Sequence, residues 1–193
     1  MIKVVIFDCF GVLTEDGWLA FERKYQTPEN SEELRYINHQ ADRGLMQYAA
    51  LLAEACRLTG AERSVAHRMI SSAHHPNEGV FDIVRKLKKD GYILGIISNA
   101  AEPLTNRLSE ELISLFDFQT LSYQVAAIKP EPAIYEAFLR QAGVDAEETI
   151  FIDDREANSE GARRVGMQAI TYQSSERLLK ELQAHGVKIE HKK

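Results

Sequence analysis

The sequence predicts an α/β fold: a Rossmann-like, doubly wound parallel sheet with helices on both faces and a small all-helical cap inserted after the first strand. Short, nearly unbroken apolar runs at 4–7, 92–97 and 149–152 are typical of strands buried on both faces. Amphipathic helical patterns separate the later runs, and this alternation favours a parallel sheet. Residues 15–76 carry helical patterns only. We therefore predict a Rossmann-like core formed by residues 1–14 and 77–193 and a cap formed by residues 15–76.

The first strand runs directly into Asp8, and Gly11 follows it. In open α/β sheets, ligands bind in the crevice outside the carboxyl ends of the strands, which is where Asp8 would lie. Gly11 allows the chain to turn sharply there. Taken alone, an aspartate after a strand is more often a turn residue.

The cap segment contains four helical patterns. Ser31 precedes Glu32 and Glu33 in the arrangement of an N-cap with acidic residues in the first turn. The strongest pattern begins at Leu45 and stops near Gly60. The predicted cap helices span 18–25, 31–41, 45–58 and 61–73.

The rest of the chain alternates between helix and strand patterns. Pro130 lies at the start of one predicted helix, where its missing N–H costs little. Ser174 or Ser175 caps the last helix. The predicted helices span 80–89, 104–115, 130–142, 155–165 and 174–185, and the predicted later strands span 92–97, 118–122, 149–152 and 168–172.

The bulk properties exclude several classes of protein. The net charge is −6 and the pI is about 5.6, so nucleic acid is not an expected partner. No apolar stretch approaches the roughly 20 residues of a membrane span, and the N-terminus leads directly into a strand. We expect a cytoplasmic protein, monomeric or homodimeric, without membrane contact. No disulfide is expected between Cys9 and Cys56 in such a chain.

Polar residues follow three of the predicted strands: Asp8, the pair Ser98–Asn99 and the pair Asp153–Asp154. If these strands are neighbours, the polar groups converge on one edge of the sheet. Three carboxylates, a hydroxyl and an amide supply the hard oxygen ligands that suit Mg²⁺. Without a cation, such carboxylates would repel one another. The sequence therefore predicts a magnesium site at this edge.

Two further residues extend this group. Lys129 directly precedes Pro130, and beside a carboxylate cluster its charge would keep an attacking aspartate ionised and neutralise phosphoryl oxygens. Asn158 follows Asp154 by four residues, near the start of a helix, where it could reach a water bound to the metal.

These segments resemble the four motifs of the haloacid dehalogenase-like hydrolase superfamily, in order and at plausible spacing. The resemblance covers nearly the whole chain, and the helical insertion resembles the small cap of one branch of the family. The four matching segments are 7–12, 97–99, 129–130 and 151–162.

The resemblance implies a role for each matching position. Asp8 would be the nucleophile that takes the phosphoryl group as an aspartyl-phosphate, with Ser98 and Lys129 as the other catalytic residues. The substrate would be a small phosphorylated molecule, bound by Ser98, Asn99, Lys129 and Gly11. The residues implied at the Mg²⁺ site are Asp8, the carbonyl of Phe10, Asp153, Asp154 and Asn158, of which Asp153 and Asn158 would act through water or orient the ligands.

Position 10 departs from the family pattern. Phosphatases of this family usually carry there a second aspartate that protonates the leaving group, whereas Phe10 cannot transfer a proton. Acid–base catalysis typically contributes about 10²–10⁴-fold, so turnover should suffer. A weak or selective Mg²⁺-dependent phosphatase is the first hypothesis, and a member that binds a phosphoryl ligand with impaired catalysis is the second. The dehalogenase branch carries tyrosine at this position and no metal, which makes a dehalogenase the third.

Other reactive residues fit less well. A cysteine phosphatase would need an arginine six residues after Cys9, where Glu15 stands. His74 and His75 fall between cap and core, and His75 is a hypothetical source of the missing proton. The remaining candidates have simpler structural interpretations as solvated, surface or core residues: His39, His67, the pair Arg43–Gly44, Trp18 and Tyr25.

Overall fold

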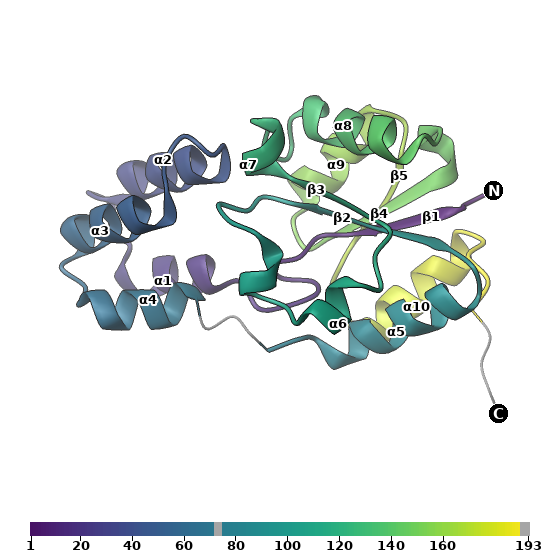
Figure 1. Cartoon of the computed structure of the whole chain (residues 1–193), viewed down its shortest axis with the longest axis horizontal. Coiled ribbons are helices and arrows are strands. Elements are labelled where there is room, and N and C mark those ends of the chain that lie inside the picture. Colours follow the sequence, from purple (N-terminus) through teal and green to yellow (C-terminus); the bar gives the residue numbers. More distant parts are fainter. Residues whose placement is uncertain (72–74, 190–193) are drawn as a thin grey trace.

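The computed structural model describes residues 1–71 and 75–189. Its strands form one five-stranded, fully parallel sheet with the order β3-β2-β1-β4-β5. Helices cover both faces, which confirms the predicted α/β class (Figure 1). The strands are β1 (Val4–Phe7), β2 (Ile93–Ser98), β3 (Phe118–Leu121), β4 (Thr149–Asp153) and β5 (Gln168–Thr171).

The alternation of side chains along each strand divides the core into two layers. In β1, Val5 and Phe7 join the layer covered by α5 (Glu78–Lys89) and α10 (Ser175–Ala184), whereas Val4 and Ile6 join the opposite layer. That opposite layer is covered by α8 (Pro132–Ala142) and α9 (Glu156–Arg164). Both sets of residues are fully buried, so β1 lies at the centre of the molecule.

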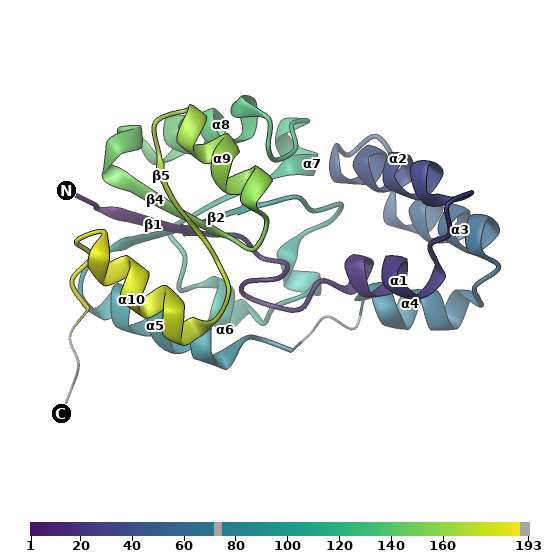
Figure 2. The same cartoon turned by 180° about the vertical axis from the view of Figure 1, so that it is seen from behind.

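Four helices between β1 and β2 pack around an apolar cluster of their own, and we call them the helical unit. Phe21, Leu34 and Leu51 lie in this cluster. The carboxyl ends of the strands point toward the helical unit in both views (Figures 1 and 2). Its division from the core at residues 14–15 and 76–77 stays a prediction. The helices are α1 (Gly17–Tyr25), α2 (Ser31–Asp42), α3 (Tyr48–Thr59) and α4 (Arg63–Ser71).

Most predicted elements lie within a residue or two of their observed bounds, with two exceptions. The helix expected from Leu45 begins at Tyr48, because Gly44 has a positive φ of 73° and turns the chain, which leaves Leu45 69% exposed. The helix expected at 104–115 is replaced by a 3₁₀ turn, η1 (Leu104–Asn106), and a short α6 (Glu110–Ile113). Ser109 caps α6 by accepting from the amide of Leu112, which starts a new helix there.

The helix expected from Pro130 begins two residues later, at Pro132. The sequence patterns also gave no sign of two short elements, α7 (Ser122–Val125) and a 3₁₀ turn, η2 (Ala146–Glu148). The end of the predicted helix at 72–73 lies outside the described residues. No helix in the described ranges has the length and apolar character needed to cross a membrane.

Candidate active site

The sheet register brings the predicted site residues to one edge. Phe7 pairs with Ile96 of β2 on one side and with Ile152 of β4 on the other. Asp8 and Asp153 each follow these paired residues directly, and Ser98 lies one residue further along β2. Three segments that are distant in sequence therefore place polar side chains side by side, as the strand patterns predict.

Lys129 lies between two of these carboxylates. Its Nζ is 2.6 Å from Asp8 Oδ1 and 2.7 Å from Asp153 Oδ2, and all three side chains are buried. Burial alone would lower the pKa of Lys129, but the charges of Asp153 and Asp8 raise it above its ordinary value. Lys129 is therefore a fixed positive charge. Burial raises the pKa of Asp8, while Lys129 acts in the opposite direction.

The side chain of Asn99 holds the backbone of Lys129. Asn99 Oδ1 accepts from the Lys129 amide at 2.8 Å, and Asn99 Nδ2 donates to the Lys129 carbonyl at 3.3 Å. This pair of hydrogen bonds fixes the loop that carries the lysine. Asn99 thus positions Lys129, and its predicted contact with substrate stays a prediction.

Asp153 is fully buried and fixed from several directions. Asn158 Nδ2 donates to both of its carboxylate oxygens, at 2.9 and 3.1 Å, and the amide of Arg155 donates to Oδ1 at 2.9 Å. Together with Lys129, these contacts leave Asp153 little freedom to turn. Asn158 therefore orients Asp153, and its predicted role at a metal site stays a prediction.

Three carboxylates form a compact cluster at this edge. Asp8, Asp153 and Asp154 each offer an oxygen within 4.8 Å of the others. Asp154 is half-buried, and burial, followed by the charge of Asp153, raises its pKa. Closely spaced carboxylate oxygens that repel one another are a donor set that suits Mg²⁺.

Gly11 makes room for this cluster. Its φ is +86°, and a Cβ at this position would lie 2.5 Å from Asp154 Oδ2. Its amide donates to the Thr14 carbonyl at 2.7 Å, and this hydrogen bond closes the turn that follows β1. The structural reason for a glycine here is thus the position of Asp154, and the predicted substrate contact of Gly11 stays a prediction.

Ser98 differs from its neighbours. Its Oγ is fully buried and has no hydrogen-bond partner among the residues that the structure describes. A buried hydroxyl without a partner is costly, and such groups are uncommon in folded proteins. An oxygen of a bound ligand would satisfy this hydroxyl, as the sequence predicts for a phosphoryl group.

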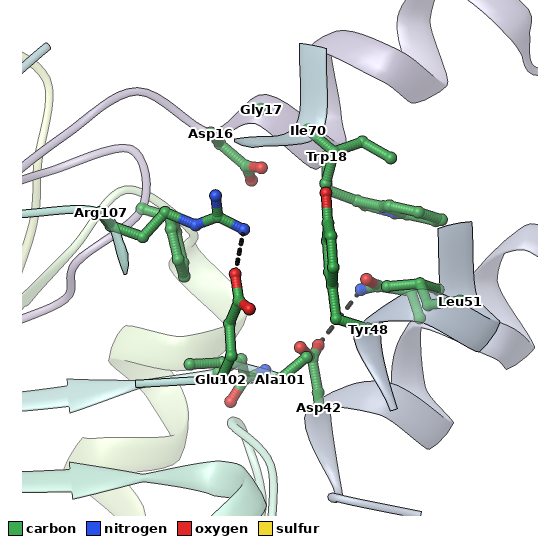
Figure 3. Close-up of a pocket in the computed structure, with 14 residues that line it drawn as sticks. Asp16, Gly17, Trp18, Asp42, Tyr48, Leu51, Ile70, Ala101, Glu102 and Arg107 are labelled. Atoms are coloured by element: carbon green, nitrogen blue, oxygen red, sulfur yellow. Dashed lines mark hydrogen bonds and ion pairs between the residues drawn. The ribbon is translucent and has the colours of Figure 1, made fainter. Parts of the chain in front are cut away.

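A small cavity of about 80 Å³ lies where the sheet edge meets the helical unit. Phe10 and Asn99 border it from the core, and Trp18, Tyr48 and Leu51 border it from the helical unit (Figure 3). The Phe10 side chain is half-buried at this junction. The cavity is therefore the space beside the position where the family pattern usually has its second aspartate.

Four charged residues line this cavity, and sequence reasoning missed all of them. Arg107 forms an ion pair with Glu102 at 2.8 Å, and its guanidinium lies 5.8 Å from the centre of the Tyr48 ring. Asp16 and Asp42 lie on the helical side. The only sequence signal near them was the pair Arg43–Gly44, directly after Asp42.

Among the described residues that have simpler structural interpretations, Trp18 borders this cavity and the others do not. His39 and His67 are exposed, which agrees with their interpretation as solvated residues. Arg43 forms an ion pair with Glu131. His75 is exposed and lines a separate surface pocket with Gly11, and His74 lies outside the described residues. Tyr25 packs on Phe21, consistent with a core residue.

Both cysteines are free, as expected. Burial raises the pKa of the Cys9 thiol, which disfavours a thiolate nucleophile.

The sequence model of the haloacid dehalogenase-like hydrolase family matches residues 2–166 of this chain. The chain therefore belongs to this family of hydrolases. Among curated proteins, it is 27% identical over 167 residues to the sesquiterpene phosphatase astK of Aspergillus oryzae. That match covers 86% of this chain and 76% of the relative.

Solved structures support the same fold. A family enzyme from Bacteroides thetaiotaomicron, in complex with magnesium and inorganic phosphate, superposes with a TM-score of 0.66 at 24% identity, covering 90% of this chain and 96% of that one. An L-2-haloacid dehalogenase from Xanthobacter autotrophicus, with chloropropionic acid covalently bound, gives a TM-score of 0.64 at 21% identity and covers 97% and 85%. The fold is thus shared by proteins whose solved structures hold different bound molecules.

Proposed function

We propose that this hydrolase is a Mg²⁺-dependent phosphatase that acts on a small phosphorylated molecule through an aspartyl-phosphate on Asp8. The observation that carries the proposal is the contact of Lys129 with both Asp8 and Asp153, beside the unpartnered hydroxyl of Ser98. A fixed cation, a carboxylate nucleophile and a free hydroxyl donor are the groups that phosphoryl transfer to an aspartate needs.

Asp8 is oriented for attack. Its Oδ1 accepts from Lys129 and from the amide of Cys9 at 2.6 Å, so Oδ2 is the oxygen that would attack phosphorus. Lys129 would neutralise the charge that develops on the phosphoryl oxygens, and Ser98 would donate a hydrogen bond to one of them. Water would then hydrolyse the aspartyl-phosphate and regenerate Asp8.

The residues present fit a magnesium ion. The oxygens of Asp8 and Asp154, with the backbone carbonyl of Phe10, would hold it, and Asp153 and Asn158 would orient these ligands. Bound there, the ion would neutralise negative charge on the phosphoryl group. The fit rests on the clustered carboxylate oxygens and on the space that Gly11 leaves for Asp154.

Two other functions have a specific observation in their favour. Phe10 supplies no proton, which favours a member that binds a phosphoryl ligand with impaired turnover. The aromatic ring at this position also favours a dehalogenase. Asp153 and Asp154 argue for the phosphatase, because their clustered oxygens suit a metal that the dehalogenase branch does not use.

Hydrolysis of 4-nitrophenyl phosphate, with Mg²⁺ or with a chelator, tests the proposal, because this leaving group departs with little need for protonation. We expect Mg²⁺-dependent turnover that Asp8→Asn abolishes, and a gain in turnover for Phe10→Asp. Binding of inorganic phosphate without turnover in the wild type would support the binding function. Release of chloride from 2-chloropropionate that survives chelation would support the dehalogenase.

A further inference from the structure

This inference rests on the proposed function and addresses the proton that Phe10 cannot supply. Three carboxylic side chains line the cavity beside Phe10: Asp16, Asp42 and Glu102. A group that protonates the leaving oxygen must hold a proton when the substrate binds, so these three differ in their suitability.

Two of these carboxyl groups have partners in the structure. Glu102 forms an ion pair with Arg107 at 2.8 Å. Asp16 caps the N-terminus of α1, and its Oδ1 accepts from the amide of Leu19 at 2.9 Å. The partial positive charge of a helix N-terminus stabilises a carboxylate there. Both carboxyl groups are therefore already engaged in contacts of their own.

Asp42 has the opposite environment. It is the last residue of α2, where the partial negative charge of the helix end disfavours an anion. Asp42 is only 7% exposed, and its Oδ2 accepts a hydrogen bond from the neutral side-chain amide of Asn38 at 3.2 Å. Among the described residues, no cation forms an ion pair with it. Its carboxyl group points into the cavity, toward the space shared with Tyr48 and Glu102 (Figure 3).

Asp42 is also fixed relative to the sheet edge, although it lies on the helical unit. The Ser122 hydroxyl donates to the carbonyl of Asp42 and accepts from the amide of Ala100 at 2.9 Å. The next residue, Arg43, donates to the carbonyl of Ala126 and forms an ion pair with Glu131. The end of α2 is therefore bound to the loop beside Ser98 and Asn99.

We propose that Asp42 is the general acid and base of this enzyme and replaces the aspartate that is absent at position 10. As the bond between phosphorus and the leaving oxygen breaks, Asp42 transfers its proton to that oxygen and becomes a carboxylate. It then accepts a proton from the water that attacks the phosphorus of the aspartyl-phosphate. The bond to Asp8 breaks, inorganic phosphate leaves, and both aspartates regain their starting states.

The electrostatic surroundings of Asp42 agree with this role. Burial, followed by the charge of Asp16, raises the pKa of Asp42 to about 7, while Lys129 and Arg155 act in the opposite direction. A group with this pKa gives up and takes back a proton readily near neutral pH. His75, the earlier candidate for the proton, does not line this cavity.

The dependence on leaving group tests the proposal. We compare the hydrolysis of 4-nitrophenyl phosphate and glycerol 2-phosphate by the wild type and by Asp42→Asn, which keeps the size of the side chain. The alkyl ester needs protonation of its leaving oxygen, so its kcat should fall by about 10²–10⁴-fold in the variant. The aryl ester should still phosphorylate Asp8 and give a burst of nitrophenolate, followed by slow turnover.

Two variants serve as controls. Asp145→Asn makes the same change at an exposed aspartate that does not line this cavity, so it should retain the wild-type kcat for the alkyl ester. Phe10→Asp combined with Asp42→Asn should recover alkyl ester turnover. An unchanged kcat for the alkyl ester in Asp42→Asn overturns the proposal. A wild type that hydrolyses only the aryl ester also overturns it, whereas no Mg²⁺-dependent turnover of either ester overturns the proposed function itself.

Unfolding in urea gives an independent readout that does not depend on turnover. The pKa of Asp42 is higher in the folded protein than in the unfolded chain, so its contribution to stability is fully present below the unfolded pKa and is lost as the pH rises through about 7. Asp42→Asn should therefore gain stability relative to the wild type between about pH 4 and pH 7. Parallel profiles would show that Asp42 ionises as easily as in the unfolded chain, which contradicts the proposal.

Discussion

The two sides of the candidate active site are built differently. On the core side, Asp8, Lys129 and Asp153 contact one another directly, and the sheet register fixes their spacing. On the side of the helical unit, the polar residues belong to different helices and meet only around the cavity. Under the proposed function, the core side would carry phosphoryl transfer and the helical side would carry proton transfer.

Removing Lys129 should break the core side and produce the largest effect on stability. In Lys129→Met, the buried carboxylates of Asp8 and Asp153 lose their cation, and removing one partner of a buried pair costs about 3–5 kcal/mol. The loss of stability should shrink as the pH falls, because the carboxylates then become protonated. Urea unfolding at several pH values measures both effects.

The matched variant is Arg43→Met, which removes the half-exposed ion pair with Glu131 between the helical unit and the core. Solvent-exposed pairs contribute about 0–1 kcal/mol, so this variant should remain close to the wild type in stability. Equal losses of stability in Lys129→Met and Arg43→Met would contradict the difference between the core side and the side of the helical unit.

Gly11→Ala should weaken Mg²⁺ binding. The added Cβ would lie 2.5 Å from Asp154 Oδ2, so the carboxylate would have to move. Displacing a metal ligand should cost about 10–100-fold in affinity, by analogy with changes in the groups that orient metal ligands. Calorimetric titration with Mg²⁺ measures the change.

Gly60→Ala is its control. Gly60 has a similar φ of +68°, but a Cβ there would have nothing within 4 Å. Both positions have a positive φ, so both alanine variants carry backbone strain, but Gly60→Ala should bind Mg²⁺ as the wild type does. Equal affinities in both variants would show that Asp154 does not depend on the space beside Gly11.

Ser98→Ala should have the smallest effect on the fold and a selective effect on the ligand. Because its Oγ has no partner among the described residues, removing it should change the free energy of unfolding by less than about 0.5 kcal/mol or stabilise the protein slightly. Binding of inorganic phosphate should weaken about tenfold, the equivalent of a typical net hydrogen bond. Unchanged phosphate affinity would remove Ser98 from the site.

The core side could be predicted from the sequence because each of its residues directly follows a strand pattern or adjoins a motif. Parallel strands bring their carboxyl ends to one edge, so Asp8, Ser98 and Asp153 had to meet once the strands were neighbours. The contact of Lys129 with Asp8 does not follow from the strand patterns alone, because it depends on a loop whose backbone Asn99 holds by hydrogen bonds.

The cavity residues could not be found in this way. Asp42 looks like an ordinary charge at the end of an amphipathic helix, and its burial depends on how α2 packs against the segment around Ser122. Arg107 lies in a segment predicted as one long helix, which is broken in the structure. Tertiary packing, rather than local pattern, places these residues.

The contacts between the helical unit and the core have a consequence for how this protein can change over generations. Ser122 donates to the carbonyl of Asp42, Arg43 donates to that of Ala126, and Arg107 donates to that of Ser71. Every amino acid supplies a backbone carbonyl, so the acceptor in each contact survives substitution of its residue. The side chains of Asp42, Ala126 and Ser71 can therefore change without undocking the two parts of the molecule, provided that the donors Ser122, Arg43 and Arg107 are kept.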